Sequence, residues 1–311
     1  MENDLPESMD KNNNISASLS LTEVTNKIRT GNASNNMVLE KDNSSVMVAV
    51  QETDWDDKVI PETRTSWTTA NNHVIWSTGD RIGVYIRSAS GGSSFFDQSN
   101  VQYNLVSGGN SLGTLAPVST PIYFPNRVTN AQFFAYYPYS SSAGNTLSVN
   151  YTLPTDQTAQ TSLSAADLMC STTPITNGAS PNVALSFSHQ MVLLSFKINT
   201  SLLSGNLTKV SVGGTKVTNT GTLNLSTATV TPNTGSTFSP SVTVNQTIGI
   251  NTYAYVDIII NPCSLTNNSS MSELKVTLTF GLLSHYTGLI TSGSFVGGRR
   301  YNYNLTVTLS V

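Results

Sequence analysis

Charged residues are scarce in this sequence, and its basic residues do not cluster. Only 11% of the 311 residues are Asp, Glu, Lys or Arg, whereas an average soluble domain has about 25%. The net charge is −3 and the 15 basic residues are dispersed, which excludes the basic surface that nucleic-acid binding requires. No apolar run approaches the ~18 residues that a membrane-spanning helix needs. We therefore expect neither a nucleic-acid partner nor a transmembrane helix.

Cysteine is almost absent, since the chain contains only Cys170 and Cys263. For so few cysteines, two buried thiols are the commoner state, although one disulfide is also compatible with the sequence. The chain also opens without the basic and then apolar segment of a secretory signal. Because cytoplasmic domains of this length rarely carry so few charges, we expect an exported protein whose signal segment has been removed.

Sequence signatures of catalysis and cofactor binding are missing as well. There is no G-x-S-x-G motif, no glycine-rich phosphate loop and no zinc-ligand spacing. None of the three histidines has a second ligand at metal-binding spacing. His189 alternates with Phe187 and Met191 on an expected strand, which favours a histidine in the core or in an interface. We expect no enzymatic activity, no cofactor and no bound metal.

A carboxylate cluster lies in a long loop before the first continuous run of strands. Asp54, Asp56 and Asp57 surround Trp55 and could hold calcium or a sugar, but the glycine and the distant glutamate of an EF-hand loop are missing. A solvated loop is the expected structure. This segment, residues 52–66, is charged and contains a proline, and loops of about 15 residues usually have a function or are mobile.

Small polar residues take the place of the missing charges, because Ser, Thr and Asn together make up 116 of the 311 residues. Thr favours strands, while Ser and Asn favour turns and helix caps. Short alternating strands recur from residue 44 onward, separated by Gly, Asn, Ser and Pro clusters and with no helices between them. This pattern predicts an all-β protein built from two tandem antiparallel β-sandwiches.

The pattern also predicts where the two sandwiches begin and end. Residues 1–43 are polar and mostly without pattern, which predicts a tether. Apolar alternation lapses between residues 155 and 182, where Pro and Gly appear, so we expect an N-terminal domain over 44–178 and a C-terminal domain over 179–311. The first expected strand covers residues 46–51, with one face formed by Val46, Val48 and Val50.

An aromatic run in the first expected sandwich has two interpretations. Phe133, Ala135 and Tyr137 share one face of a strand, and Phe134 and Tyr136 share the other. Packing into cores on both faces is the simpler interpretation. The alternative is a platform on which carbohydrate stacks, with the candidate ligand-binding aromatic residues Tyr136, Tyr137, Tyr139, Trp55 and Trp67.

Five groups of residues, taken in order, form a pattern that runs from about residue 44 to the end. They are Trp76, Gly79, Asp80, Ile82, Gly83, Val84 and Tyr85; Phe134, Ala135, Tyr136, Tyr137, Pro138 and Tyr139; Asp167, Leu168 and Met169; Phe187 and His189; and Gly297, Gly298, Tyr301, Tyr303, Leu305, Thr306 and Val307. Each motif is weak alone, but their order and spacing are fairly specific. Together they resemble the Bacteroides-type fimbrillins, the subunits of type V pili.

The resemblance implies a fold, a location and a mode of assembly. It implies two transthyretin-like Greek-key β-sandwiches, exported as a lipoprotein to the outer membrane and displayed in a fimbrium at the cell surface. In that family a protease cuts after a basic residue behind the first strand, and a strand from a neighbouring subunit fills the groove left behind. Here the displaced strand would be residues 46–51, and the processing site would be Arg64, with Lys58 as the alternative. An ordinary exposed loop is the competing interpretation of both basic residues.

Two departures from the family pattern limit what can be carried over. The lipid-bearing cysteine is absent, so anchoring to the outer membrane is inferred only for an uncut precursor. Residues 303–311 provide one strand's length after Arg300; if the protein's own sandwich needs that strand, none is left to donate, which favours a tip or accessory subunit over a stalk subunit. The partners would be other fimbrial subunits and an unidentified host or bacterial surface ligand. The alternative function is a surface glycan-binding lipoprotein that does not polymerise.

Overall fold

The computed structural model describes residues 76–307 except for 90–96, 110–111, 120, 125–129, 174, 178–181, 202–203, 236–237, 267–271, 282–283 and 291, together with strand segments at 15–16, 18–22, 39–41, 44–46 and 50–51. These residues form strands and one short helix, α1 (Gln160–Ala166). The all-β class predicted from the sequence is therefore confirmed. No helix in the described ranges is long and apolar enough to cross a membrane.

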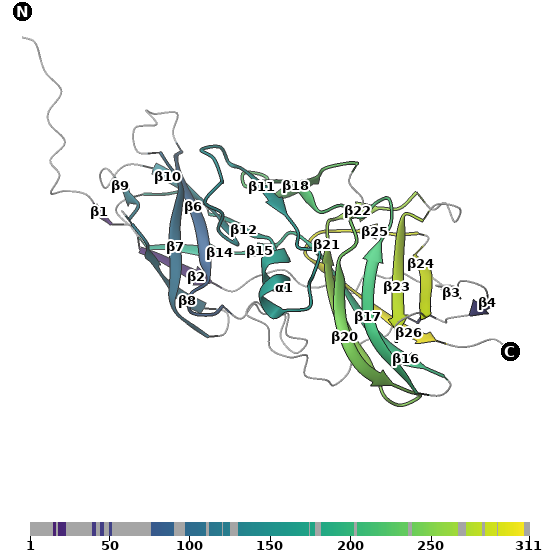
Figure 1. Cartoon of the computed structure of the whole chain (residues 1–311). Coiled ribbons are helices and arrows are strands. Elements are labelled where there is room, and N and C mark those ends of the chain that lie inside the picture. The colour runs from purple at the N-terminus through teal and green to yellow at the C-terminus, as the bar shows by residue number, and fades with distance from the viewer. Residues whose placement is uncertain are drawn as a thin grey trace, which may run out of the picture.

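One large sheet dominates the half of the molecule that contains β6, β7, β8 and β10 (Figure 1). Its strands pair antiparallel except for β14 and β2, which are parallel. A separate pair beside it joins β1 (Ile15–Ser16) to β9 (Tyr123–Phe124). The order across the large sheet is β14 (Asn182–Ser186), β2 (Ser18–Thr22), β8 (Leu112–Pro117), β7 (Gln98–Gly109), β6 (Arg81–Ser88), β10 (Asn130–Tyr137), β12 (Met169–Thr172) and β15 (Ser188–His189), with β13 (Thr176–Asn177) also paired to β10.

The other half contains four smaller sheets. A six-stranded sheet has the order β20 (Ser241–Ile248), β17 (Gly205–Gly213), β23 (Leu274–Phe280), β24 (Ser284–Ile290), β3 (Leu39–Lys41) and β4 (Ser44–Val46). A four-stranded sheet has the order β21 (Ala254–Ile260), β16 (Val192–Thr200), β26 (Arg299–Val307) and β5 (Val50–Gln51). The remaining two sheets are β11 (Ser148–Thr152), β18 (Thr220–Asn224) and β19 (Thr229–Pro232), and the pair β22 (Cys263–Ser264) and β25 (Ser294–Phe295).

The strand pairing differs from the expected domain bounds in two places. Residues 1–43 were expected to be a tether, yet β2 and β3 lie within them. The N-terminal domain was expected to end at 178, yet β14 and β15 still pair within the first sheet, and the chain enters the second half with β16. In the sequence, the alternating run from 183 to 198 indicates two consecutive strands of the same domain. Alternation cannot show that the strands belong to different sheets, because it carries no information about which sheet a strand joins.

The expected strand over residues 46–51 is wrong as a single element. The structure has two short strands, β4 and β5, which belong to different sheets. β4 pairs with β3, and β5 pairs with β26, so both lie in the second half of the molecule and not in the first sandwich. Strands of two or three residues are so short that a period-two pattern in the sequence cannot show where one ends and the next begins.

Both faces of the first sheet are buried at β6 and β10, which decides how the aromatic run of β10 packs. Phe133, Ala135 and Tyr137 join one apolar cluster together with Trp76 and Ile82. On the opposite face a larger cluster is continuous from the first sheet to the sheets of the second half, and it includes Tyr85, Phe134, Tyr136, Met191 and Phe196. The simpler interpretation of the aromatic run, core packing on both faces, is therefore confirmed.

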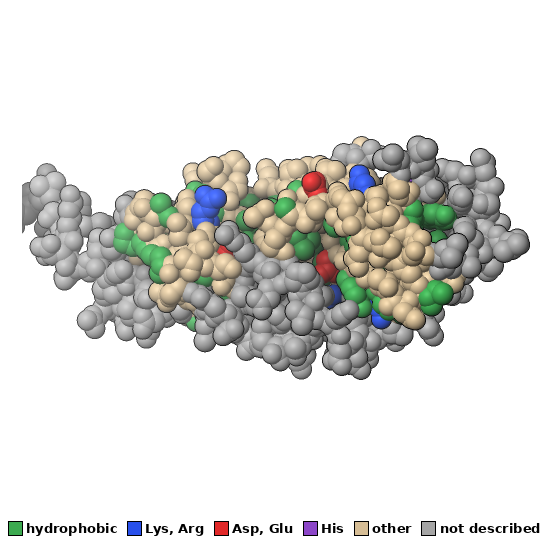
Figure 2. All heavy atoms as spheres, turned by 60° about the horizontal axis from the view of Figure 1, so that its bottom comes forward, with side chains coloured by type: hydrophobic (Ala, Val, Ile, Leu, Met, Phe, Trp, Pro, Cys, Tyr) green, Lys and Arg blue, Asp and Glu red, His purple; other side chains and the backbone are tan. Residues whose placement is uncertain are grey.

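Few charges lie on the described surface seen in Figure 2. Uncharged polar side chains and backbone cover most of that face, with a few separate Lys, Arg, Asp and Glu side chains among them. This distribution follows from the composition, in which Ser, Thr and Asn outnumber charged residues about threefold. Contacts of this face with a partner would therefore depend on hydroxyl, amide and backbone groups more than on charge.

Candidate functional site

Strand β2 occupies an internal position of the first sheet, although it comes from the N-terminal segment. It pairs in parallel with β14, where Leu19 lies beside Val183 and Leu21 beside Leu185. On its other side it pairs antiparallel with β8, where Leu21 lies opposite Gly113. Val183 and Leu185 are 4% and 0% exposed and belong to the core of this sheet. β2 therefore closes the sheet between two strands that have no described pairing with each other.

The later N-terminal strands complete two sheets in the other half. β3 pairs with β24, where Glu40 lies opposite Thr287. β5 pairs with β26, where Val50 lies opposite Leu305. Leu305 and its neighbour Tyr303 are buried, so β5 extends a sheet whose inner face belongs to the core. Four of the described sheets thus contain strands that precede residue 52, the pair of β1 and β9 included.

Some of the predicted site residues lie within the described strands, and others lie outside the described residues. Val46 ends β4 and Val50 begins β5, whereas Val48 lies outside the described residues. Both candidate processing residues, Arg64 and Lys58, and the candidate aromatic residues Trp55 and Trp67 also lie outside the described residues, as does the Asp54 cluster. Their roles stay predictions.

Two of the candidate ligand-binding aromatic residues are part of the core. Tyr136 and Tyr137 are 0% and 5% exposed, so neither ring offers a face to a ligand. The Tyr136 hydroxyl donates to Asn100 Oδ1 at 2.8 Å and accepts from the Ser140 N–H at 3.0 Å, and burial raises the pKa of this hydroxyl. The Tyr136 ring also lies over Gly83, where a Cβ atom would come within 2.2 Å of it. A carbohydrate platform that includes Tyr136 and Tyr137 is therefore excluded.

Tyr139, by contrast, lines a cavity of about 440 Å³. The cavity lies between the end of β10, strand β11 and helix α1. Its lining residues are uncharged. In the part of the chain that the structure describes, no three His, Cys, Asp or Glu side chains gather as they would around a metal ion.

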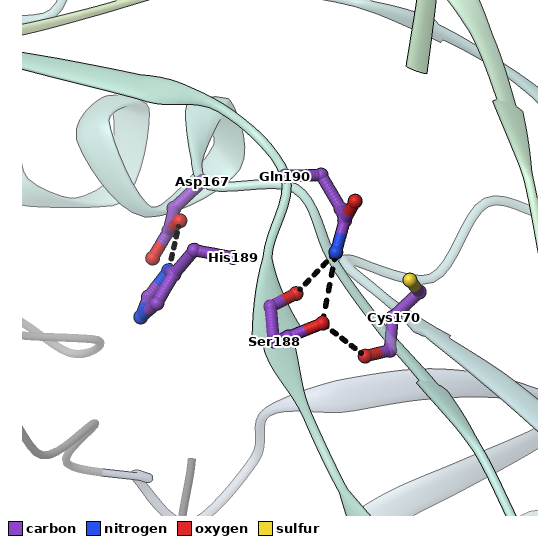
Figure 3. A network of polar contacts seen from close by, with 5 residues as sticks. All are labelled: Asp167, Cys170, Ser188, His189 and Gln190. Atoms are coloured by element: carbon purple, nitrogen blue, oxygen red, sulfur yellow. Dashed lines mark hydrogen bonds and ion pairs between the residues drawn. The ribbon is translucent and has the colours of Figure 1, made fainter. Parts of the chain in front are cut away.

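A buried pair joins two of the motifs that carry the family resemblance. His189 Nδ1 lies 2.6 Å from Asp167 Oδ1, and the two residues are 5% and 1% exposed (Figure 3). Asp167 directly follows α1, and His189 ends β15, the last strand of the first sheet. The expected core histidine is confirmed. Its role in the described contacts is to hold the end of the first sheet against the helix.

The residues beside this pair form a second set of polar contacts (Figure 3). Gln190 Nε2 donates to the Ser188 carbonyl and to Ser188 Oγ, both at 2.9 Å. Ser188 Oγ donates to the Cys170 carbonyl at 3.4 Å. The Gln190 N–H donates to the Leu168 carbonyl at 2.8 Å. We call residues 188–191, which lead from β15 into β16, the joint between the sheets.

The closing glycine motif packs on the same joint. A Cβ atom at Gly297 would lie 2.3 Å from the Gln190 carbonyl oxygen. The Gly298 N–H donates to the Met191 carbonyl at 2.8 Å, and Gly298 has a φ of 74°, in the left-handed region that glycine adopts most readily. Three motifs that are far apart in the sequence therefore meet at one structural joint, where the described contacts are those of packing and hydrogen bonding.

Gly297→Ala is expected to lower the free energy of unfolding by about 2 kcal/mol, because the added methyl group would press on a backbone carbonyl that cannot rotate away. Gly144→Ala is the matched control, since a Cβ atom there meets nothing within 4 Å. Chemical denaturation of both variants and the parent protein measures the difference. Equal stability of the two variants would contradict the close packing of Gly297 on the joint.

Both cysteines are free thiols and lie in different sheets. Cys170 is in β12 and is buried, whereas Cys263 is in β22 and is half-buried. Burial raises the pKa of the Cys170 thiol to about 12 and that of the Cys263 thiol to about 11. Of the two states left open by the sequence, the structure has free thiols and no disulfide between them, with one thiol buried and the other half-buried. At neutral pH neither sulfur is a thiolate, so neither is an activated nucleophile.

Comparison with known proteins identifies relatives over most of the chain. A family model described as fimbrillin-like matches residues 63–311. A curated protein of Bacteroides uniformis, assigned as fimbrium subunit Fim1C, is 28% identical over 243 residues, which cover 75% of this chain and 74% of that protein.

Crystal structures of two proteins assigned to cell adhesion have a similar fold. One, from Bacteroides uniformis, is 24% identical with a TM-score of 0.58 and covers 75% of this chain and 88% of its own. The other, from Bacteroides ovatus, is 18% identical with a TM-score of 0.59 and covers 80% of this chain and 92% of its own. Because the family model spans well over half of the sequence, the chain belongs to the fimbrillin-like family.

Proposed function

We propose that the chain is a structural or adhesive subunit of a surface fimbria, which assembles with other subunits by strand exchange after proteolysis at Arg64 or Lys58. Membership of the fimbrillin-like family and the similarity to a protein assigned as a fimbrium subunit support the first part of the proposal. The exchange rests on one structural observation, the internal position of β2 between β14 and β8.

Removal of β2 would leave an acceptor site in the first sheet. The edges of β8 and β14 would each expose unpaired backbone groups, and such edges pair readily with an added strand. Val183 and Leu185, which now lie beside β2, would lose the strand next to their backbone. An extended segment with alternating apolar residues would restore both sets of contacts.

A cut at Arg64 or Lys58 would separate all of the N-terminal strands from the rest of the chain, since β1 to β5 end at residue 51. The edges at β24 and β26 would then open together with the position of β2. One proteolytic event would thus prepare both halves of the molecule. This is a reason for a subunit to carry a long segment without strong alternation, residues 52–66, between its removable strands and its core.

Strand β26 is used within the protein's own fold. It pairs in parallel with β16 over nine residue pairs, from Val192 with Arg299 to Thr200 with Val307. Tyr301, Tyr303, Leu305 and Val307 are buried. Residues 299–307 are therefore better suited to complete this sheet than to be donated, which supports an accepting role. The tip or accessory position, the outer-membrane lipid anchor and the fimbrial location remain predictions of this proposal.

Limited trypsin digestion of the folded protein tests the proposal. We expect an early cut at Arg64 or Lys58, loss of the N-terminal fragment from the remaining core, and binding of a fluorescent peptide of residues 15–24 to the cleaved protein but not to the intact one. The Lys58→Gln/Arg64→Gln variant is the control, and it should neither be cut in this segment nor bind the peptide. Retention of the fragment by a cleaved protein that stays monomeric and does not bind the peptide would contradict strand exchange.

A further inference from the structure

The cavity beside Tyr139 is open to solvent on one side and is bordered by three elements of the fold. The end of β10 and the following turn contribute one wall, β11 contributes the second, and α1 contributes the third. Its volume of about 440 Å³ lies within the range of ~300–1,000 Å³ that is typical of small-ligand pockets. Eleven residues line the cavity, among them Tyr139, Ser140, Ser142, Asn150, Tyr151 and Thr152.

Strand β11 presents backbone groups to this cavity. It is an edge strand, paired only with β18 among the described strands. The Leu153 N–H donates to the Asn219 carbonyl, and the Leu225 N–H donates to the Leu147 carbonyl. Since hydrogen-bonded positions alternate along an antiparallel pair, the N–H and C=O groups of Asn150 and Thr152 point away from β18. Both residues line the cavity, so these groups are available to a ligand.

The turn that forms the opposite wall is held in place by side chains of the first sheet. Asn100 Nδ2 donates to the Ser140 carbonyl at 2.9 Å and to the Ala143 carbonyl at 3.2 Å. The Tyr85 hydroxyl donates to the Gly144 carbonyl at 3.0 Å. Such a wall is already ordered before a ligand arrives, and preformed sites lose less conformational entropy on binding.

The wall formed by β11 is also fixed. The Tyr151 hydroxyl donates to Asn261 Oδ1 at 2.7 Å, and Asn261 Nδ2 donates in turn to the Thr218 carbonyl at 2.9 Å. Tyr151 lies over Gly221, where a Cβ atom would come within 2.3 Å of the Tyr151 hydroxyl. These contacts hold the Tyr151 hydroxyl beside β18, and Tyr139 and Tyr151 are the two aromatic side chains that line the cavity.

We propose that this cavity binds a neutral carbohydrate, a ligand of one or two sugar rings. None of the eleven lining residues is charged, so the site offers no counter-charge to an acidic or basic ligand. Hydroxyls of Ser140, Ser142 and Thr152 and the outward backbone groups of β11 can exchange hydrogen bonds with sugar hydroxyls. The half-buried Tyr139 ring supplies the apolar contact that the C–H face of a sugar prefers.

A peptide strand added to β11 is the competing occupant, because an open edge can also pair with a strand. Only two residues of β11, Asn150 and Thr152, present outward groups within the lining. That stretch is shorter than the ~5–6 residues of a usual strand, and the volume suits a compact ligand. The carbohydrate assignment stands whether or not the chain polymerises, because no lining residue belongs to β1 to β5.

Saturation-transfer NMR of the intact protein with neutral mono- to tetrasaccharides containing glucose, galactose, fucose or N-acetylglucosamine tests the proposal. At least one sugar should bind, with its dissociation constant raised tenfold or more by Tyr139→Ala. Thr152→Trp, at an exposed lining position, should fill the cavity and abolish binding. Thr229→Trp is the matched control, because Thr229 is exposed on β19 at the opposite edge of the same sheet, and it should leave binding unchanged.

Three results would overturn the assignment. One is the absence of binding by every neutral sugar. Another is binding that survives Thr152→Trp at full strength, which would place the sugar elsewhere. The third is a peptide from an extended-peptide library that binds the parent protein and is excluded by Thr152→Trp, which would assign the cavity to strand addition. Thermal unfolding of each variant separates loss of the site from loss of the fold.

Discussion

Asp167→Ala is expected to lower the free energy of unfolding by about 3 kcal/mol, since it leaves a buried imidazole without its carboxylate partner. Asp167 and His189 are 1% and 5% exposed, and their contact is 2.6 Å long. Water cannot readily replace the lost hydrogen bond at such a position. The effect should reach both halves of the molecule, because His189 is the last residue of β15 and lies within the joint between the sheets.

A double-mutant cycle with His189→Ala isolates the contribution of the pair. The double variant should be less destabilised than the sum of the two single variants, with a coupling of about 1–3 kcal/mol. His285→Ala is the matched control, since His285 is exposed and its ring forms a hydrogen bond with the Thr279 hydroxyl at the surface; its effect should be within about 0.5 kcal/mol. Chemical denaturation followed by circular dichroism measures the parent protein and all four variants. Strict additivity would mean that the contact does not stabilise the joint.

The all-β class could be predicted from the sequence because local patterns determine it. In β10 every residue from Phe133 to Tyr137 is buried, and their alternation between two faces follows directly from the geometry of a strand. The same geometry places Tyr85 on the opposite face of β6 from Val84. Where a strand is long and both of its neighbours are close in sequence, the period of the apolar residues and the composition are sufficient to predict the strand and its two faces.

The N-terminal strands could not be predicted in this way. β2 and β3 are short and rich in polar residues, and β2 reaches its partner β14 across more than 150 residues. Pairing of that kind depends on what the acceptor sheet lacks, and a local pattern carries no information about it. For this reason the sequence predicts a tether over residues 1–43, where the structure has strands.

The role of the motifs could also not be read from the sequence. Asp167, His189 and Gly297 were singled out by resemblance, but only the structure shows that they meet, with His189 against Asp167 and Gly297 against Gln190. The cavity beside Tyr139 could likewise be found only from the structure. The sequence marked Tyr139 as one member of an aromatic run, whereas burial separates it from Tyr136 and Tyr137. A turn after the strand changes the direction of the side chain, and no periodicity extends through a turn.

Trp76→Ala should have the largest effect on stability of any single change considered, about 4 kcal/mol. Trp76 is 1% exposed and packs edge-on against Tyr137 and Phe187, with ring centroids 5.4 and 5.1 Å away. It therefore holds together three segments. Trp76 itself precedes β6, Tyr137 ends β10, and Phe187 connects β14 to β15. Loss of the indole leaves a cavity that these rings cannot fill without moving the strands that carry them.

Trp76→Phe separates the contribution of volume from that of the indole N–H. In the described part of the structure Trp76 Nε1 is buried and has no hydrogen-bond partner. A phenyl ring therefore removes no hydrogen bond, and because it fills most of the space of the indole it should cost about 2 kcal/mol, half the loss in Trp76→Ala. Hydrogen exchange should localise the damage in Trp76→Ala to β6, β10 and β14, with β23 and β17 less affected because they belong to the other apolar cluster. Equal destabilisation by both substitutions would contradict this account, since the indole N–H and not the packing of the ring would then stabilise the first sheet.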